Sequence, residues 1–207
     1  MAGVWRLIRV RRARQVLATT AVLLAVAVAA GGCSLFGSDG DKPEGPAQTP
    51  AGFKTHQANL YSISYPDSWT VTEKPNSSGG PPIVVIQGTS GSGGFSPQIA
   101  VGHDTNYSSD FDDAMEIFRT VSIGKTGTVV SDEPTDLAGA ARAQRTEYTE
   151  QQPGKDGQQH TIRVVEIHAL TADRTMYDVL VRAPKEDFDG AQLDQALDSF
   201  RIVGATS

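Results

Sequence analysis

The ten residues Leu60–Trp69, LYSISYPDSW, decide the fold of this chain. Large side chains alternate with serines over residues 60–65, and a period of two predicts a half-buried strand. Residues 66–68, Pro-Asp-Ser, predict a tight turn. Residues 69–73 then predict an antiparallel partner strand. The stretch indicates a domain that begins with a β-hairpin.

Six further segments after this hairpin have strand-like alternation or β-branched runs: 83–87, 98–102, 128–131, 140–150, 161–170 and 176–182. Two segments have a helical period of 3.6 instead, 111–118 and 187–199, with Ser108 or Ser109 as a cap of the first. Short turns join sequential strands, which favours antiparallel pairing. We therefore expect an α+β fold, a mainly antiparallel sheet of about seven to eight strands flanked by two helices.

The two ends of this pattern resemble a known family. The segment 60–69 resembles the opening hairpin of PsbP-type domains, with its Y-x-I-x-Y-P-x-x-W pattern, and LDSFRI at 197–202 resembles their end. The layout is also similar to that of small actinobacterial LpqN-type lipoproteins. The resemblance implies an α/β/α sandwich, in a family whose members mostly serve as binding or assembly factors. The matched tyrosines, proline and tryptophan are core and turn residues, so the motif indicates fold and not activity.

The N-terminus has the parts of a secretory signal. The first fifteen residues hold five arginines and no acid, and the uncharged run Val16–Ala30 follows. That run is shorter than the roughly 20 residues of a membrane-spanning helix. AAGGC at 29–33 resembles a bacterial lipobox, although Ala30 replaces the usual leucine. The resemblance implies cleavage between Gly32 and Cys33 and a diacylglyceryl group on the Cys33 thiol.

Three regions follow from this pattern. Residues 1–32 are a signal peptide, 33–53 are the lipidated cysteine and a flexible linker rich in Gly, Pro and Ser, and 54–207 are the globular domain. Arg11-Arg12 raises the twin-arginine export route, but the residues after the pair favour general secretion. We expect a lipid-anchored protein on the outer face of the cytoplasmic membrane, with the membrane as one partner.

Charge excludes some other partners. The chain has 18 basic and 24 acidic residues, and loss of the five signal arginines leaves a net charge of about −11. Nucleic acid is disfavoured, because phosphate contacts need Lys and Arg. A second, polybasic membrane contact is disfavoured for the same reason. Cys33 is the only cysteine, so no internal disulfide can form.

Two motifs partly match a phosphate-binding loop and a calcium-binding loop, but their spacing does not support either site. Gly124-Lys125-Thr126 lacks the first P-loop glycine, since Arg119 stands there, and it follows a helix instead of opening one. Oxygen-bearing side chains alternate from Asp104 to Asp112, as in a calcium loop. Such a loop needs a glycine where Ser109 stands and a glutamate where Met115 stands. Helix capping explains these acids.

Catalytic patterns are equally weak. The four histidines lack zinc-site spacing. Glu166 and His168 share one face of a strand and could form a polar pair, but we expect this face to be solvated. Gly91-Ser92-Gly93 is not a nucleophile elbow, because it lies in the glycine-rich segment 88–95, which predicts a flexible connection. The sequence therefore predicts no catalytic, cofactor-binding or metal-binding residue.

Two classes of function remain. One is a binding or assembly module for an envelope protein or a lipid-like ligand, and the alternative is a cell-envelope hydrolase. A large exposed apolar patch would indicate a protein partner, and a deep apolar pocket a lipid-like ligand. A cleft with a convergent nucleophile and base would indicate the hydrolase. A structural surface protein without a ligand is the third reading.

Overall fold

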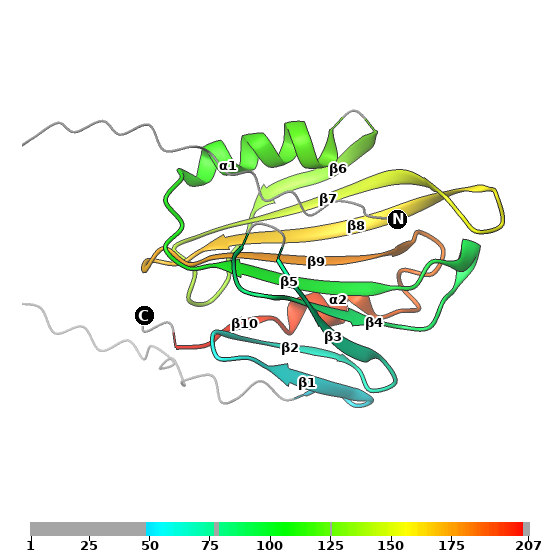
Figure 1. Cartoon of the computed structure of the whole chain (residues 1–207), viewed down its shortest axis with the longest axis horizontal. Coiled ribbons are helices and arrows are strands. Elements are labelled where there is room, and N and C mark those ends of the chain that lie inside the picture. Colours follow the sequence, from blue (N-terminus) through cyan, green and yellow to red (C-terminus); the bar gives the residue numbers. More distant parts are fainter. Residues whose placement is uncertain (1–48, 77–78, 125, 205–207) are drawn as a thin grey trace, which may run out of the picture. The chain divides into compact units, whose positions relative to one another are not determined.

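The computed structural model describes residues 49–76, 79–124 and 126–204 (Figure 1). In chain order the elements are β1 (Phe53–Gln57), β2 (Tyr61–Pro66), β3 (Thr70–Lys74), β4 (Ile83–Gln87), the 3-10 turn η1 (Ser92–Gly94), β5 (Gln98–Asp104), α1 (Phe111–Ile117), the π-helical turn η2 (Phe118–Ile123), β6 (Gly127–Pro134), β7 (Arg142–Pro153), β8 (Gln159–Leu170), β9 (Met176–Pro184), α2 (Leu193–Asp198) and β10 (Arg201–Ile202). This content confirms the expected α+β class. None of the helices in the described residues is long and apolar enough to span a membrane.

The strands form two antiparallel sheets. The large sheet has the order β3-β4-β5-β9-β8-β7-β6, and the small sheet has the order β1-β2-β10. The expected pairing of residues 60–65 with 69–73 is wrong, because β2 pairs with β1 and β10 whereas β3 pairs with β4. The turn after Pro66 thus carries the chain from one sheet to the edge of the other. The sequence analysis does not predict β1, of which only Phe53 is buried, or β10, which has two residues.

The small sheet and α2 cover one face of the large sheet. Tyr61 and Ile63 from β2 pack there with Phe200, and all three side chains are buried. Two hydrogen bonds fix this layer: the Tyr177 hydroxyl donates to the Leu60 carbonyl at 3.2 Å, and the Ser64 amide donates to the Ser199 hydroxyl at 2.7 Å. Most residues that resemble the PsbP ends therefore serve the core, whereas Trp69 is only partly buried and packs at its margin.

The helical segment α1–η2 covers the opposite face of the large sheet. Its stripe of Phe111, Met115 and Phe118 packs against apolar side chains of β7, β8 and β9. The cap of α1 is Asp110 and neither of the expected serines, because the Asp110 carboxylate accepts from the Asp112 amide at 2.8 Å. Gly124, with φ +60°, ends the segment.

The second helix is shorter than its sequence pattern predicts. The expected helix over 187–199 contains an α-helix only at 193–198, and residues 185–192 form turns. Gln192 adopts a left-handed conformation, with φ 56°, and this stops the helix from extending toward the N-terminus. The segment 185–192 is thereby free to contact the connections at the end of the large sheet.

Candidate ligand-binding site

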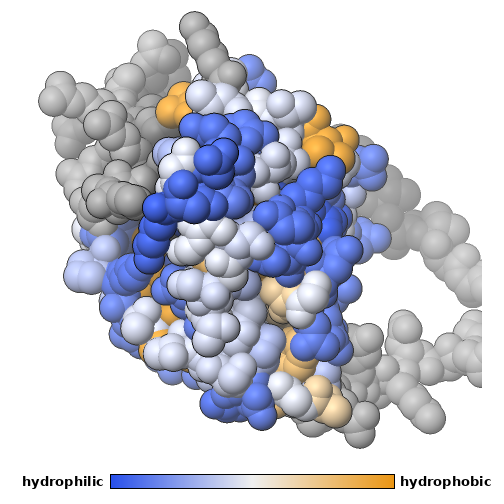
Figure 2. All heavy atoms as spheres, turned by 90° about the vertical axis from the view of Figure 1, so that its right-hand side faces the viewer, coloured by the Kyte–Doolittle hydropathy of each residue, from blue (hydrophilic) through white to orange (hydrophobic). Residues whose placement is uncertain are grey.

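Three connections meet at one end of the large sheet, on the right in Figure 1. They are the β4–β5 connection (88–97, with η1), the tip of the β7–β8 hairpin (153–158) and the β9–α2 connection (185–192). We call these three connections, together with Trp69, the loop end. Figure 2 faces it and shows pale, weakly polar residues between two bands of hydrophilic ones. Such connections on a rigid sheet commonly carry binding sites.

The glycine-rich connection is held in place, in contrast to the flexible segment that its composition predicts. The Asp187 carboxylate accepts two hydrogen bonds from Ser92, from the amide at 2.8 Å and from the hydroxyl at 3.1 Å. The Lys155 amide donates to the Gly93 carbonyl at 2.9 Å. Both neighbouring connections therefore fix η1.

Close approach explains the glycines in this connection. A Cβ on Gly88 would lie 2.7 Å from Cε2 of Trp69, and one on Gly91 would lie 2.5 Å from Oδ2 of Asp187. Gly93, with φ +59°, leaves no room for a side chain beside His160. The sequence shows only a glycine run, and nothing in it distinguishes close packing from flexibility.

His160 joins the hairpin to the β9–α2 connection. Its Nε2 lies 2.8 Å from Oδ2 of Asp156, and its Nδ1 lies 3.7 Å from Oε1 of Glu186. The hydrogen bond to Asp156 raises the pKa of His160 above its ordinary value. The ring of Phe95 stands edge-on to the imidazole. His160 is therefore a linking residue between loops.

The loop end contains an open depression of about 380 Å³. Its walls are Trp69, Glu186, Asp187, Pro97 and small residues of the neighbouring connections, and no Lys, Arg or His lines it. Trp69 is partly exposed, and its indole lies against Gly88. The depression therefore presents an aromatic ring, two carboxyl groups and backbone on one concave surface.

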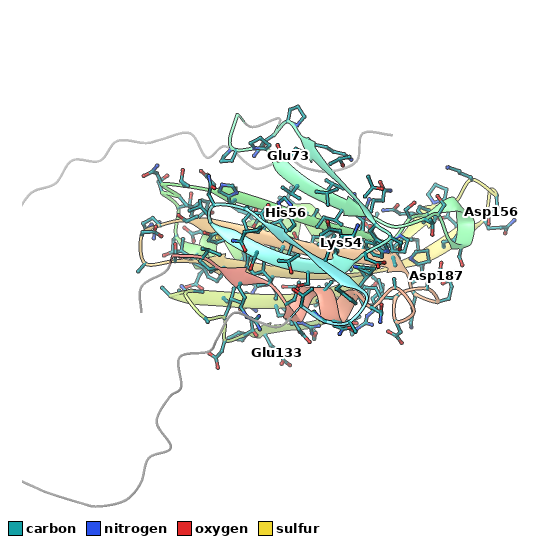
Figure 3. The ribbon with its side chains drawn as sticks, turned by 90° about the horizontal axis from the view of Figure 1, so that it is seen from below. Lys54, His56, Glu73, Glu133, Asp156 and Asp187 are labelled. Carbon is teal, nitrogen blue, oxygen red and sulfur yellow. The ribbon has the colours of Figure 1, made fainter. Side chains whose placement is uncertain are left out.

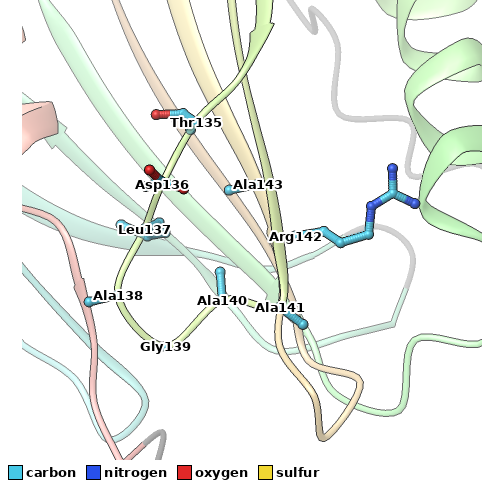
Figure 4. Close-up of a pocket in the computed structure, with 9 residues that line it drawn as sticks. All are labelled: Thr135, Asp136, Leu137, Ala138, Gly139, Ala140, Ala141, Arg142 and Ala143. Carbon is cyan, nitrogen blue, oxygen red and sulfur yellow. The ribbon is translucent and has the colours of Figure 1, made fainter. Parts of the chain in front are cut away.

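A second depression, also about 380 Å³, lies beside the β6–β7 connection (Figure 4). Small residues and backbone of 135–143 form most of it. Its one basic side chain, Arg142, points away and makes a bidentate pair with Asp112 over the Phe111 ring. This depression offers fewer recognition groups than the one at the loop end.

The expectation of a solvated face for Glu166 and His168 is wrong. Both side chains are buried, because α1 and η2 cover this face of β8. Nε2 of His168 lies 3.7 Å from Oε1 of Glu166 and 3.5 Å from Oδ1 of Asp178 on β9. The Tyr148 hydroxyl donates to Oε2 of Glu166 at 3.3 Å, and the ring of Phe118 contacts the imidazole.

Burial governs the titration of this cluster. It raises the pKa of Glu166 to about 8 and that of Asp178 to about 7, and it lowers the pKa of His168 to about 4. The neutral forms are thus favoured, and the short His–carboxyl distances do not imply a full ion pair. Perturbed pKa values often mark functional sites. Here neither depression includes these residues, so the cluster belongs to the core.

The remaining sequence motifs have structural roles where they are described. Asp110 caps α1, Asp112 pairs with Arg142, and Gly124 ends η2, whereas Lys125 lies outside the described residues. The Ser92 hydroxyl donates to a carboxylate and has no imidazole partner. No set of three His, Cys, Asp or Glu in the described residues could hold a metal ion.

The predicted lipidation site, Cys33, and its cleavage partner Gly32 lie outside the described residues. The anchor therefore stays a prediction of the sequence.

Exposed large apolar side chains in the described residues are four valines, and three of them, Val121, Val129 and Val130, lie on η2 and β6. β6 is an edge of the large sheet, and its register shifts between Val129 and Ser131. A bulge of this kind protects an edge from strand addition. The valines are thus a weaker candidate than the loop end.

Comparison with known proteins confirms the expected PsbP-like fold. Residues covering 76% of this chain align with 99% of the cyanobacterial PsbP protein (CyanoP) of Synechocystis sp. PCC 6803, at 13% identity and a TM-score of 0.51. LpqN of Mycobacterium tuberculosis, involved in cell envelope biogenesis, is similar over 72% of this chain and 90% of its own, at 15% identity and a TM-score of 0.44. PA94 of Pseudomonas aeruginosa, a protein of unknown function, is similar over 71% of this chain and 94% of its own, at 11% identity and a TM-score of 0.46.

At these identities the likeness establishes the fold alone. No family model matches the sequence, and no curated protein matches it.

Proposed function

We propose that this chain is a lipid-anchored binding module on the outer face of the cytoplasmic membrane, and that it holds an envelope protein at the loop end. The observation that carries the proposal is the depression in which Trp69, Glu186 and Asp187 converge. Cys33 would supply the anchor, and the predicted linker before β1 would let the domain reach its partner.

Rigid loops support a binding role. Hydrogen bonds from Ser92 and Lys155 fix the glycine-rich connection before any partner arrives. A surface that is already ordered loses less conformational entropy on association, so more of its contact energy appears as affinity.

A protein partner suits the depression better than a lipid-like ligand. Pockets for lipid-like ligands are deep and mostly apolar. The depression is open, and carboxyl groups and backbone form much of its wall. Tryptophan is the residue type most typical of protein-binding hot spots.

The hydrolase alternative lacks an accessible set of catalytic groups in the described residues. The acids with the most perturbed pKa values, Glu166 and Asp178, lie under α1 and η2. At the loop end, the Ser92 hydroxyl donates to Asp187, and both ring nitrogens of His160 face carboxylates, those of Asp156 and Glu186, so neither nitrogen is bonded to the hydroxyl.

The test is capture of envelope proteins by the full chain, produced in a lipidating bacterial host. Ser90→Arg places a bulky cation at the exposed rim of the depression, and Val130→Arg places the same side chain on the exposed edge of β6. We expect a saturable partner that Ser90→Arg loses and Val130→Arg retains. Loss with Val130→Arg alone, or capture of no protein by the unmodified chain, would overturn the proposal.

A further inference from the structure

We propose that the depression at the loop end receives a basic side chain of the partner, with arginine preferred over lysine. This inference rests on the proposed function and adds the chemistry of recognition. The cation would stack on Trp69 and pair with Glu186.

Charge is the first argument. Glu186 and Asp187 lie side by side on the β9–α2 connection, and no Lys, Arg or His lines the depression. His160 is not a lining residue, although its Nδ1 lies 3.7 Å from Oε1 of Glu186. The Glu186 side chain is 52% exposed, so it can reach a ligand. Asp187 is committed to Ser92, but its charge still faces the same space. The local potential therefore favours a cation.

Shape is the second argument. Trp69 gives the depression an indole, the best of the aromatic rings for binding a cation over its face. The indole N–H makes no hydrogen bond with the described residues. Pro97 and Ala191 add apolar wall on which an aliphatic stem can lie. A long side chain with an apolar stem and a cationic head fits all of these features.

The domain itself provides the third argument, because it uses the same combination twice internally. Arg163 stacks on the Phe188 ring at 4.1 Å and is bidentate to Glu147. Arg142 stacks on the Phe111 ring at 4.7 Å and pairs with a carboxylate of α1. The depression has the ring and the carboxylate of this arrangement but no arginine of its own. The planar guanidinium can stack and pair at once, which is why we prefer arginine.

Fluorescence provides a direct test, because the chain has two tryptophans, Trp5 and Trp69. Trp5 lies in the predicted signal peptide, so with Trp5→Phe the only tryptophan is the one in the depression, whether or not the signal is removed. The probes are tetra-arginine, tetra-lysine and tetra-glutamate peptides at about 0.15 M salt, where long-range attraction is screened. We expect a saturable change in Trp69 emission with tetra-arginine, weaker binding of tetra-lysine, and no response to tetra-glutamate.

A matched pair of variants separates the site from general attraction to an acidic protein. Glu186→Gln should weaken tetra-arginine binding by about three- to tenfold. Glu133→Gln removes the same charge from an exposed residue of β6, which Figure 3 places away from Asp187, and should leave binding unchanged.

Two results would overturn the inference: no emission change with tetra-arginine, or equal weakening by both variants. If the unmodified chain still captures an envelope protein and the Ser90→Arg variant does not, the proposed function stands and only the cationic chemistry of the site is wrong. If that capture also fails, both proposals fall.

Discussion

Replacement of Glu166 by glutamine should stabilise the domain at alkaline pH. Glu166 is buried on β8 between the Tyr148 hydroxyl and the His168 imidazole. Glutamine has nearly the same shape and can still accept the Tyr148 hydrogen bond, but it cannot ionise. Glu166→Gln therefore removes the cost of a buried charge with little change in packing.

The magnitude follows from the pKa of Glu166, which burial raises from 4.5 to about 8. A carboxyl group with a raised folded-state pKa favours folding fully below pH 4.5, and this contribution is lost as the pH rises toward 8. The largest possible loss of folding free energy is about 5 kcal/mol, because each tenfold change in the ionisation equilibrium corresponds to about 1.4 kcal/mol. Structural relaxation reduces this, so we expect Glu166→Gln to gain about 1–3 kcal/mol at pH 9.

Urea unfolding of the two chains at pH 5 and pH 9 measures the effect. At pH 5 the difference should fall below about 1 kcal/mol, since Glu166 is then protonated in the folded protein. His168 stays largely neutral in the folded protein at pH 5, because burial lowers its pKa to about 4. Glu133→Gln, on the exposed edge, should change stability by less than about 0.5 kcal/mol at both pH values. A Glu166→Gln chain that is less stable at pH 9 would refute the reasoning.

Three further predictions test the anchor and the loop end. Cys33→Ser should move the full chain from the membrane fraction to the soluble fraction; continued sedimentation with membranes after an alkaline wash would contradict lipidation. Gly93→Ala should lower the free energy of unfolding in urea by about 1–3 kcal/mol more than Gly157→Ala. Both glycines have positive φ, but only a Cβ at position 93 would meet His160. Equal losses of stability would show that the loop rearranges to accommodate the methyl group. An NMR titration should give His160 a raised pKa that Asp156→Asn lowers, so that this contact is strongest at acidic pH and weakens as the pH rises through that pKa; an unchanged value would exclude the contact.

Local periodicity predicts most strands and the α1 stripe, because each depends on residues close in the chain. The pairing of strands is a different matter. β2 and β3 are separated by a tight turn, yet they join different sheets, since the buried side chains of β2 pack across the large sheet and do not extend it. No local pattern distinguishes this crossing from a hairpin.

The candidate site is harder to predict for the same reason. Asp187 falls in a segment with a helical period, and only its hydrogen bonds to Ser92, 95 residues away in the chain, show that it holds a loop. The burial of Glu166 and His168 likewise depends on α1, which comes from an earlier part of the chain. Sequence reasoning treats each segment alone, so it misses the contacts that create both clusters.

Photo-crosslinking in native membranes tests the central claim most directly. A photoreactive amino acid at Ser90 lies on the rim of the depression, and the same group at Val130 lies on the edge of β6. Binding at the loop end predicts a discrete protein adduct from position 90 and none from position 130. An adduct from position 130 alone, or no adduct from either position, would contradict the account.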